Sequence, residues 1–213
     1  MKKYIAESIG TFALVFCGTG SMIVNDLTQG SVTHVGIAIT FGAIVMAMIY
    51  AFGNISQAHI NPAVSIAFSI TDRFDHKHLL GYISFQILGA LLASGLLNII
   101  FINHPTLGAT IPVGSWQQSF LLELILTYFL MIVILFVSQT DSIDQFTGIA
   151  VGATVMLESM FAGPICGASM NPARSIAPAI VSRNLSYLWI YISAPIIGGL
   201  LASITWHLIG RKS

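Results

Sequence analysis

The sequence predicts an all-α membrane protein with six transmembrane helices and two half-helices arranged as an inverted repeat. Three observations favour this fold class. The chain is 55% hydrophobic and only 8% charged. Six of its stretches approach the roughly 20 apolar residues that a bilayer-spanning helix needs. The tripeptide Asn-Pro-Ala occurs once in each half, at 61–63 and at 171–173. Together these features predict two related halves that share one function.

The composition excludes several classes of protein. A soluble domain carries about 25% charged residues, so a chain with 8% cannot cover a water-facing surface, and the lipid bilayer is its expected partner. The formal net charge of zero gives no basic surface for nucleic acid, and no nucleic-acid motif is present. Cys17 and Cys166 occupy unmatched positions without metal-ligand spacing. We therefore expect two unpaired cysteines, no metal and no cofactor.

Six apolar stretches are the expected spans, in the order Tyr4–Val24, His34–Phe52, Leu79–Ile102, Trp116–Val137, Phe146–Gly163 and Tyr187–Ile209. Two segments of roughly half that length, Pro62–Ile70 and Pro172–Val181, follow Asn61 and Asn171. Asn is a strong N-cap residue and Pro suits the first helical position, so each Asn-Pro-Ala predicts the start of a half-helix. Paired short segments at matching places in two halves point to a transport site.

Two carboxylates strengthen the match between the halves. Glu7 lies near the start of the first span and Glu123 early in the fourth, and each is followed four residues later by threonine. With three spans per half, the second half must cross the membrane in the opposite sense. The sequence therefore predicts one domain, 1–213, built from inverted repeats at about 1–104 and 115–213. The two half-helices then point at each other from opposite sides.

The basic residues predict the orientation, because Lys and Arg are enriched in cytoplasmic loops. The side that holds both termini carries Lys2, Lys3, Arg73, Lys77, Arg211 and Lys212. The opposite side carries only Arg174 and Arg183, and Arg174 lies within a half-helix segment. We expect a multi-pass protein of the cell membrane with both termini in the cytoplasm.

The two half-helix starts are the expected pore centre. A helix N-terminus carries a partial positive charge, and the amides of Asn61 and Asn171 can donate hydrogen bonds to a passing oxygen. Two such ends facing one point repel cations and protons while binding neutral polar solutes weakly. The alternative is that each Asn only caps its helix. One copy alone favours that alternative, whereas two symmetric copies do not.

Four further charged residues have competing interpretations. Arg174 lies in the first turn of the second half-helix, and an intramembrane charge is functional by default, although it could also tie down its loop. The symmetric placement of Glu7 and Glu123 favours bracing of the backbone N–H groups of the two loops over a proton relay. Glu158 has no counterpart in the first half, and the sequence leaves open a pore-end carboxylate or a pH-sensitive group.

These features resemble the aquaporin (major intrinsic protein) family over the whole chain. The resemblance implies a homotetramer with one pore per subunit and a selectivity filter at Phe41, Ser159, Ala168 and Arg174. Water-selective members resemble Phe, His, a small residue and Arg at these places, whereas this chain has Ser where they have His. Such a replacement widens the constriction and leaves a hydroxyl for a polyol. The segment 161–175 looks most similar to nodulin-like intrinsic proteins and their bacterial relatives.

The sequence thus predicts a passive channel for water and small uncharged solutes that excludes protons and ions. Glycerol is the expected solute beyond water, and uncharged metalloid acids are a further candidate. One alternative is a strictly water-selective pore. Another is a secondary transporter coupled to protons through Glu158, Glu7 and Glu123. No paired histidine and nucleophile or metal motif indicates an enzyme.

Overall fold

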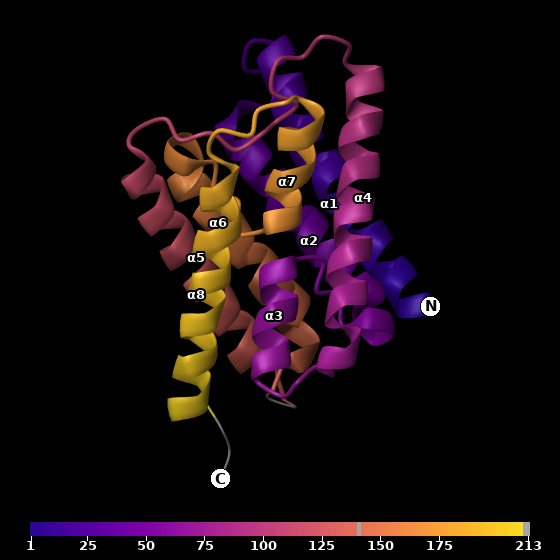
Figure 1. Cartoon of the computed structure of the whole chain (residues 1–213), viewed down its shortest axis with the longest axis vertical. Helices are drawn as coiled ribbons and strands as arrows, with labels where there is room; N and C mark the ends of the chain where they lie inside the picture. Colours follow the sequence, from indigo (N-terminus) through magenta and orange to yellow (C-terminus); the bar gives the residue numbers. More distant parts are fainter. Residues whose placement is uncertain (140–141, 211–213) are drawn as a thin grey trace.

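The computed structural model describes residues 1–139 and 142–210, and eight α-helices lie in that part of the chain. They are α1 (Lys2–Leu27), α2 (Thr33–Ser56), α3 (Pro62–Ile70), α4 (Leu79–Ile100), α5 (Trp116–Val137), α6 (Thr147–Cys166), α7 (Pro172–Val181) and α8 (Leu188–Ile209). In Figure 1 the long helices surround α3 and α7, which lie one above the other. Single 3₁₀ turns at His76–His78 and Asp144–Phe146 lead into α4 and α6.

The predicted fold class is confirmed. Six helices are long and apolar enough to cross a membrane, and the two half-helices begin at Pro62 and Pro172 as predicted. The ends of the long helices differ slightly from the predicted stretches. The helix α2 continues past Phe52 to Ser56, and α6 continues past Gly163 to Cys166 with Pro164 in its last turn. A proline there removes one N–H from the helix, but the turn still closes on Gly167 in the left-handed region.

Each half-helix is held by a long helix of the other half. The largest helix contacts are α1 with α4, α5 with α8, and α2 with α6. Against this frame α3 packs mainly on α8, and α7 packs mainly on α4. Because α3 belongs to the first half and α8 to the second, the two halves are interlocked at their centre.

Glycines allow the long helices to approach closely. A Cβ on Gly89 of α4 would lie 2.0 Å from the carbonyl oxygen of Ser8 on α1, and one on Gly198 of α8 would lie 2.3 Å from that of Leu124 on α5. Ser8 and Leu124 each follow one of the two intramembrane carboxylates in sequence. Small residues at helix crossings are typical of membrane bundles. Here they bring the carboxylate-bearing helices close to their partners.

The start of α1 and the end of α8 belong to one end of the bundle. The Tyr4 hydroxyl lies 2.9 Å from Nδ1 of His78, where α4 begins. Arg73, which follows α3, donates hydrogen bonds of 2.8 and 3.0 Å to the carbonyls of Leu135 and Ser138, where α5 ends. Trp206 near the end of α8 donates to Gln139 at 2.7 Å. The starts of α1 and α4 and the ends of α3, α5 and α8 therefore share this end.

The basic residues near this end include Lys2, Lys3, Arg73 and Lys77, while Arg183 follows α7 at the other end. Arg211 and Lys212, which the orientation prediction also used, lie outside the described residues, as does the last part of the expected second repeat. The outer surface of the long helices is apolar, with side chains such as Leu92, Leu121 and Leu157 more than half exposed. Such a surface suits contact with lipid chains.

The close crossing of α1 and α4 gives a first prediction. Gly89→Ala should lower the melting temperature of the detergent-purified protein by several degrees, because its methyl group would overlap the Ser8 carbonyl and overpacking costs about 1–3 kcal/mol. Gly95→Ala is the control on the same helix, since a Cβ there meets no atom within 4 Å. Equal melting temperatures for the two variants would contradict this account of the crossing.

Candidate functional site

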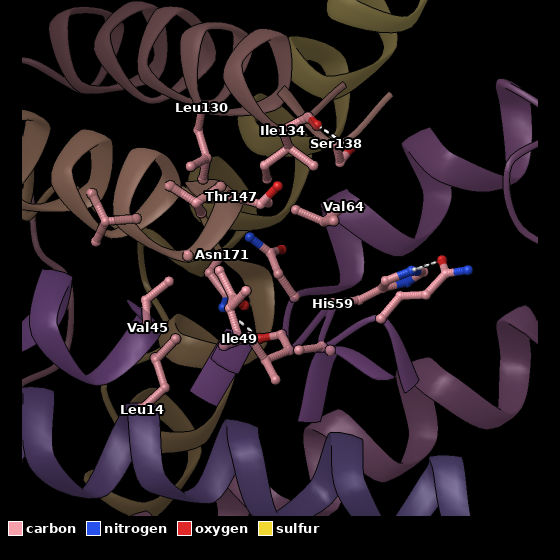
Figure 2. Close-up of a pocket in the computed structure, with 18 of the residues that line it drawn as sticks. Leu14, Val45, Ile49, His59, Val64, Leu130, Ile134, Ser138, Thr147 and Asn171 are labelled. Carbon is pink, nitrogen blue, oxygen red and sulfur yellow. Dashed lines mark hydrogen bonds between the residues drawn. The ribbon is translucent and has the colours of Figure 1, made fainter. Parts of the chain in front are cut away.

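A cavity of about 590 Å³ extends from the end of the bundle that holds the termini to the region of Phe41 and Arg174. Its mouth includes Asn54, Gln145 and Thr147, and its middle includes both motif asparagines. In Figure 2, Asn171 lies among apolar side chains that α2 and α5 contribute, including those labelled Val45, Ile49, Leu130 and Ile134. The cavity therefore has apolar walls with a few polar groups at its centre.

The two Asn-Pro-Ala motifs meet at this centre through reciprocal hydrogen bonds. The Oδ1 atom of Asn61 accepts from the Ala63 N–H at 2.9 Å, and that of Asn171 accepts from the Ala173 N–H at 3.0 Å, so both residues cap their half-helices. Their Nδ2 atoms reach across to the other loop. Asn61 donates to the Met170 carbonyl at 2.8 Å, and Asn171 donates to the Ile60 carbonyl at 2.9 Å.

This pairing leaves one N–H of each asparagine amide for a ligand. An amide nitrogen carries two hydrogens, and one of them is used by the opposite loop. Both asparagines line the cavity. The N-termini of α3 and α7 also converge here, because each helix begins directly after its asparagine. Two donors and two positive helix ends therefore face the same stretch of cavity.

The loops before the motifs adopt matching strained conformations. The backbone φ angles are +46° at Ala58 and +44° at Ile60, and they are +40° at Ala168 and +52° at Met170. These residues stand three and one positions before each asparagine. A positive φ is costly for residues with a side chain, more so for a β-branched one such as isoleucine. The strain must be offset by contacts that hold each loop.

Two buried carboxylates supply those contacts. Glu7 accepts hydrogen bonds from the backbone N–H groups of His59 at 2.9 Å and Ile60 at 2.6 Å. Glu123 accepts from the N–H groups of Ser169 and Met170, both at 2.8 Å. Each carboxylate thus holds the two residues that precede an asparagine. Both side chains are fully buried.

Neutral polar side chains extend the network around Glu7. Gln86 on α4 donates to the Glu7 carboxylate at 2.7 Å and to the Ser65 hydroxyl at 2.9 Å. The Ser56 hydroxyl donates to Glu7 at 2.7 Å, and Nδ1 of His59 lies 3.0 Å from the Ser65 hydroxyl. The sequence prediction did not include Gln86. The sequence feature that could have indicated Gln86 is an amide side chain inside an apolar span. In the structure this side chain is fully buried, and a buried amide needs a hydrogen-bonding partner.

In the second half, serine and threonine hydroxyls form a hydrogen-bond network beside the loop that precedes Asn171. The Ser175 hydroxyl, four residues after Asn171, lies 2.6 Å from the Ser169 hydroxyl. It also accepts from the Thr110 hydroxyl at 2.8 Å. Ser65 stands in the same relation to Asn61. Both half-helices therefore present a serine of their first turns to the loop that precedes them.

Arg174 is 1% exposed and is held by three different segments. Its Nη1 donates to the carbonyl of Gly108, between α4 and α5, at 2.8 Å, and its Nη2 lies 3.1 Å from Sδ of Met22 on α1. The guanidinium carbon stands 5.0 Å from the centre of the Phe41 ring, within cation–π range. No described residue accepts a hydrogen bond from its Nε atom. Met22 and Gly108 were not among the expected site residues.

The structure brings together three of the four expected filter residues. Phe41, Ala168 and Arg174 all line the cavity. Ser159, on α6, is 6% exposed and does not occur among the described residues that line it. Its place in the selectivity filter therefore stays a prediction.

Glu158, also on α6, is 9% exposed, and none of the described residues donates a hydrogen bond to its Oε2 atom. It is likewise absent from the described lining of the cavity.

Cys17 and Cys166 are both free thiols. The described residues include no group of three or more His, Cys, Asp or Glu side chains that could hold a metal ion.

Arg73 marks the mouth of the cavity near the chain termini. Its two hydrogen bonds to the end of α5 use carbonyls that have no partner within that helix. Its guanidinium carbon lies 5.2 Å from the centre of the Phe68 ring. Partial burial lowers the pKa of Arg73 from its ordinary value. This fixed cation therefore connects the first half of the chain to the second at the mouth.

Known proteins resemble this arrangement over nearly the whole chain. The sequence model of the major intrinsic protein family matches residues 1–206. The chain belongs to the major intrinsic protein family. This finding confirms the resemblance that the doubled motif indicated. Proteins of this family are membrane-embedded channels for water and small solutes, not enzymes, so the cavity belongs to a channel.

Individual relatives indicate which members of the family this chain resembles. A probable NIP-type aquaporin of Nicotiana alata is 49% identical over 98% of this chain and 78% of its own length. Nodulin-26 of Glycine max is 40% identical over the same shares of the two chains. Among solved structures, the aquaglyceroporin from Plasmodium falciparum matches with a TM-score of 0.88 at 27% identity, covering 98% of this chain and 96% of the other.

The carboxylate contacts give a second prediction. Glu123→Gln should lower the melting temperature and the water permeability of proteoliposomes, because the new amide NH₂ would face a backbone N–H of Ser169 or Met170. An unsatisfied buried donor costs about 1–3 kcal/mol. Glu158→Gln is the matched control, since its Oε2 accepts no hydrogen bond from the described residues. A larger loss in the control than in Glu123→Gln would refute the assignment.

Proposed function

We propose that this channel conducts water and small uncharged solutes, including glycerol and uncharged metalloid acids, and excludes protons and ions. The observation that carries the proposal is the pair of asparagine amides in the cavity, each with one N–H left for a solute oxygen. A polar neutral molecule can accept from both donors in turn. Because the surrounding walls are apolar, the donors hold it weakly and release it.

Ion exclusion follows from the charges at two levels of the cavity. At the centre, the N-termini of α3 and α7 add partial positive charges on the channel axis. Nearer Phe41, the Arg174 guanidinium adds a full positive charge. Both repel a cation or a hydronium ion. The two asparagine donors also orient a water molecule with its oxygen toward them, which disfavours proton transfer along a chain of waters.

We assign the size limit to Phe41, Ala168 and Arg174, which line the cavity, and to Ser159, which does not occur among the described residues that line it. Phe41 and Arg174 bound the cavity with large side chains, and Ala168 contributes a small one. Ser159 leaves more room at its position than a histidine would. The names of the relatives, an NIP-type aquaporin and an aquaglyceroporin, support a solute range wider than water alone.

Glu7 and Glu123 are assigned to bracing of the loops, not to proton transport. Both carboxylate groups are occupied by backbone donors of the loops that precede Asn61 and Asn171. Neither residue is among the described residues that line the cavity. A proton relay would need each carboxylate to exchange its donors during transport, which would release the strained loops. The bracing contacts therefore favour a passive pore over a proton-coupled transporter.

The membrane setting completes the proposal. We assign the end with both termini to the cytoplasm, because Lys2, Lys3, Arg73 and Lys77 gather there. We assign the protein to the cell membrane and to a homotetramer with one pore in each subunit, as the family resemblance implies. The two parts α1–α4 and α5–α8 then act as inverted repeats that each contribute one asparagine.

Stopped-flow light scattering on proteoliposomes tests the solute range. An inward glycerol gradient should cause swelling, with a flux that is linear in glycerol concentration and indifferent to an imposed pH gradient. A boric acid gradient in the same measurement tests whether the channel conducts uncharged metalloid acids. Water flux without glycerol flux would instead establish a strictly water-selective pore. Saturable uptake driven by the pH gradient would establish a proton-coupled transporter.

Charge exclusion has a separate test. Arg174→Gln should admit protons or monovalent cations that the native channel rejects, because one unit charge changes the energy of a cation roughly 4 Å away by about 4 kcal/mol at an effective dielectric constant of about 20. Arg183→Gln removes the same charge from an exposed residue at the same end of the bundle and should leave ion rejection intact. A pH-sensitive dye trapped in the vesicles measures the leak. Equal rejection by both variants would remove Arg174 from the ion barrier.

A further inference from the structure

One turn of α1 packs behind the narrow part of the cavity. Gly18, Thr19 and Met22 of this turn each contact a different part of the constriction: the Phe41 ring, Gly108 and the Arg174 guanidinium. Gly18 and Met22 are four residues apart and therefore lie on the same face of the helix. None of these three residues lines the cavity within the described part of the chain. They form a layer behind the side chains that do.

The contact at Gly18 is the closest of the three. A Cβ atom on Gly18 would stand 2.1 Å from Cε1 of the Phe41 ring and 2.5 Å from both Cδ1 and Cζ. Contacts this short are far inside van der Waals range, so one whole edge of the ring occupies the space that a side chain at residue 18 would take. Glycine is the residue that lets the Phe41 ring lie against the backbone of α1.

The other two contacts fix what lies on the far side of the ring. A Cβ on Gly108 would meet the Thr19 Cβ at 2.8 Å, so this loop also rests directly on α1. The Gly108 carbonyl then accepts from Nη1 of Arg174, and Met22 receives Nη2. The guanidinium is thereby held 5.0 Å from the centre of the Phe41 ring. The ring therefore has α1 along one edge and the Arg174 guanidinium over its face, and it borders the cavity.

A side chain at residue 18 would push the Phe41 ring away from α1. The ring cannot move into the α1 backbone, and the cavity that it lines together with Arg174 is the open space beside it. The clashing atoms belong to a side chain and not to backbone. The fold can therefore accommodate the change by moving the ring, and this movement narrows the constriction.

We propose that Gly18 is a specificity-determining position of this channel, which sets the solute size limit by letting the Phe41 ring withdraw against α1. It is a positioning residue, because it acts through Phe41 and touches no solute. The inference rests on the proposed role of Phe41 and Arg174 as the constriction. A larger residue at position 18 makes the pore more restrictive without altering any residue that lines it.

Gly18→Ala provides the test in proteoliposomes, with water and glycerol permeability measured on the same preparation. The variant should lower the ratio of glycerol to water permeability by about tenfold, the lower limit of the discrimination that one methylene group gives in a close-fitting site. Gly20→Ala is the matched control on the same helix, where a Cβ would meet Cδ2 of Leu97 at an ordinary 3.4 Å. It should keep the native ratio. An unchanged ratio in Gly18→Ala would overturn the proposal.

A Phe41→Ala background separates this mechanism from a general structural effect. With the ring absent, adding Gly18→Ala should change neither permeability, because the new methyl group has nothing to displace. An equal effect of Gly18→Ala in both backgrounds would overturn the proposal. If Gly18→Ala alone fails to assemble, Gly18→Ala/Phe41→Ala should still assemble and match Phe41→Ala. Failure of that double variant would show that the clash does not involve Phe41.

The same set of proteins distinguishes this inference from the proposed solute range. If the native channel passes water and no glycerol, the proposed solute range fails, and the water permeabilities of the four Gly18/Phe41 combinations still test the coupling. In that case Gly18→Ala should lower water permeability only where Phe41 is present. Equal water permeability with and without the methyl group in the native background would then overturn the inference by itself.

Discussion

The reciprocal pair of hydrogen bonds between the two motif loops is the constraint on which the rest of the structure depends. Asn61 donates to the Met170 carbonyl, and Asn171 donates to the Ile60 carbonyl. Ile60 and Met170, which supply those carbonyls, both have positive φ angles. The strained backbone and the hydrogen bonds across the centre therefore occur at the same two residues.

The buried carboxylates explain how the strained loops persist inside a membrane. Ionised or not, a carboxyl group at this depth is costly unless donors surround it. Glu7 has two backbone N–H groups and the side chains of Ser56 and Gln86 around it. Glu123 has the N–H groups of Ser169 and Met170. The loop stabilises the carboxylate and the carboxylate stabilises the loop, so neither feature is stable in lipid without the other.

Much of the fold could be predicted because lipid imposes strong rules on sequence. Each span needs a long apolar stretch, and an Asn-Pro pair marks the start of a half-helix, so α3 and α7 begin where the sequence indicated. The packing around Arg174 could not be predicted. Gly108 acts through a backbone carbonyl that every residue has, and Met22 acts through a thioether that usually only fills space. The place of Ser159 in the filter stays a prediction, because the described lining of the cavity does not include it.

Each half-helix packs mainly on a long helix of the other half of the chain, and this affects the order in which the protein assembles during synthesis. A ribosome delivers the first half to the membrane before the second half exists. Until then α3 lacks α8, its main packing partner, and Asn61 lacks the Met170 carbonyl. Until the second half is made, the first half therefore lies in the bilayer without the contacts that complete its central loop. The permeation path comes into being only after α7 has been inserted from the other side. A chain that stops before α7 therefore lacks one of the two asparagines and one of the two positive helix ends of the path.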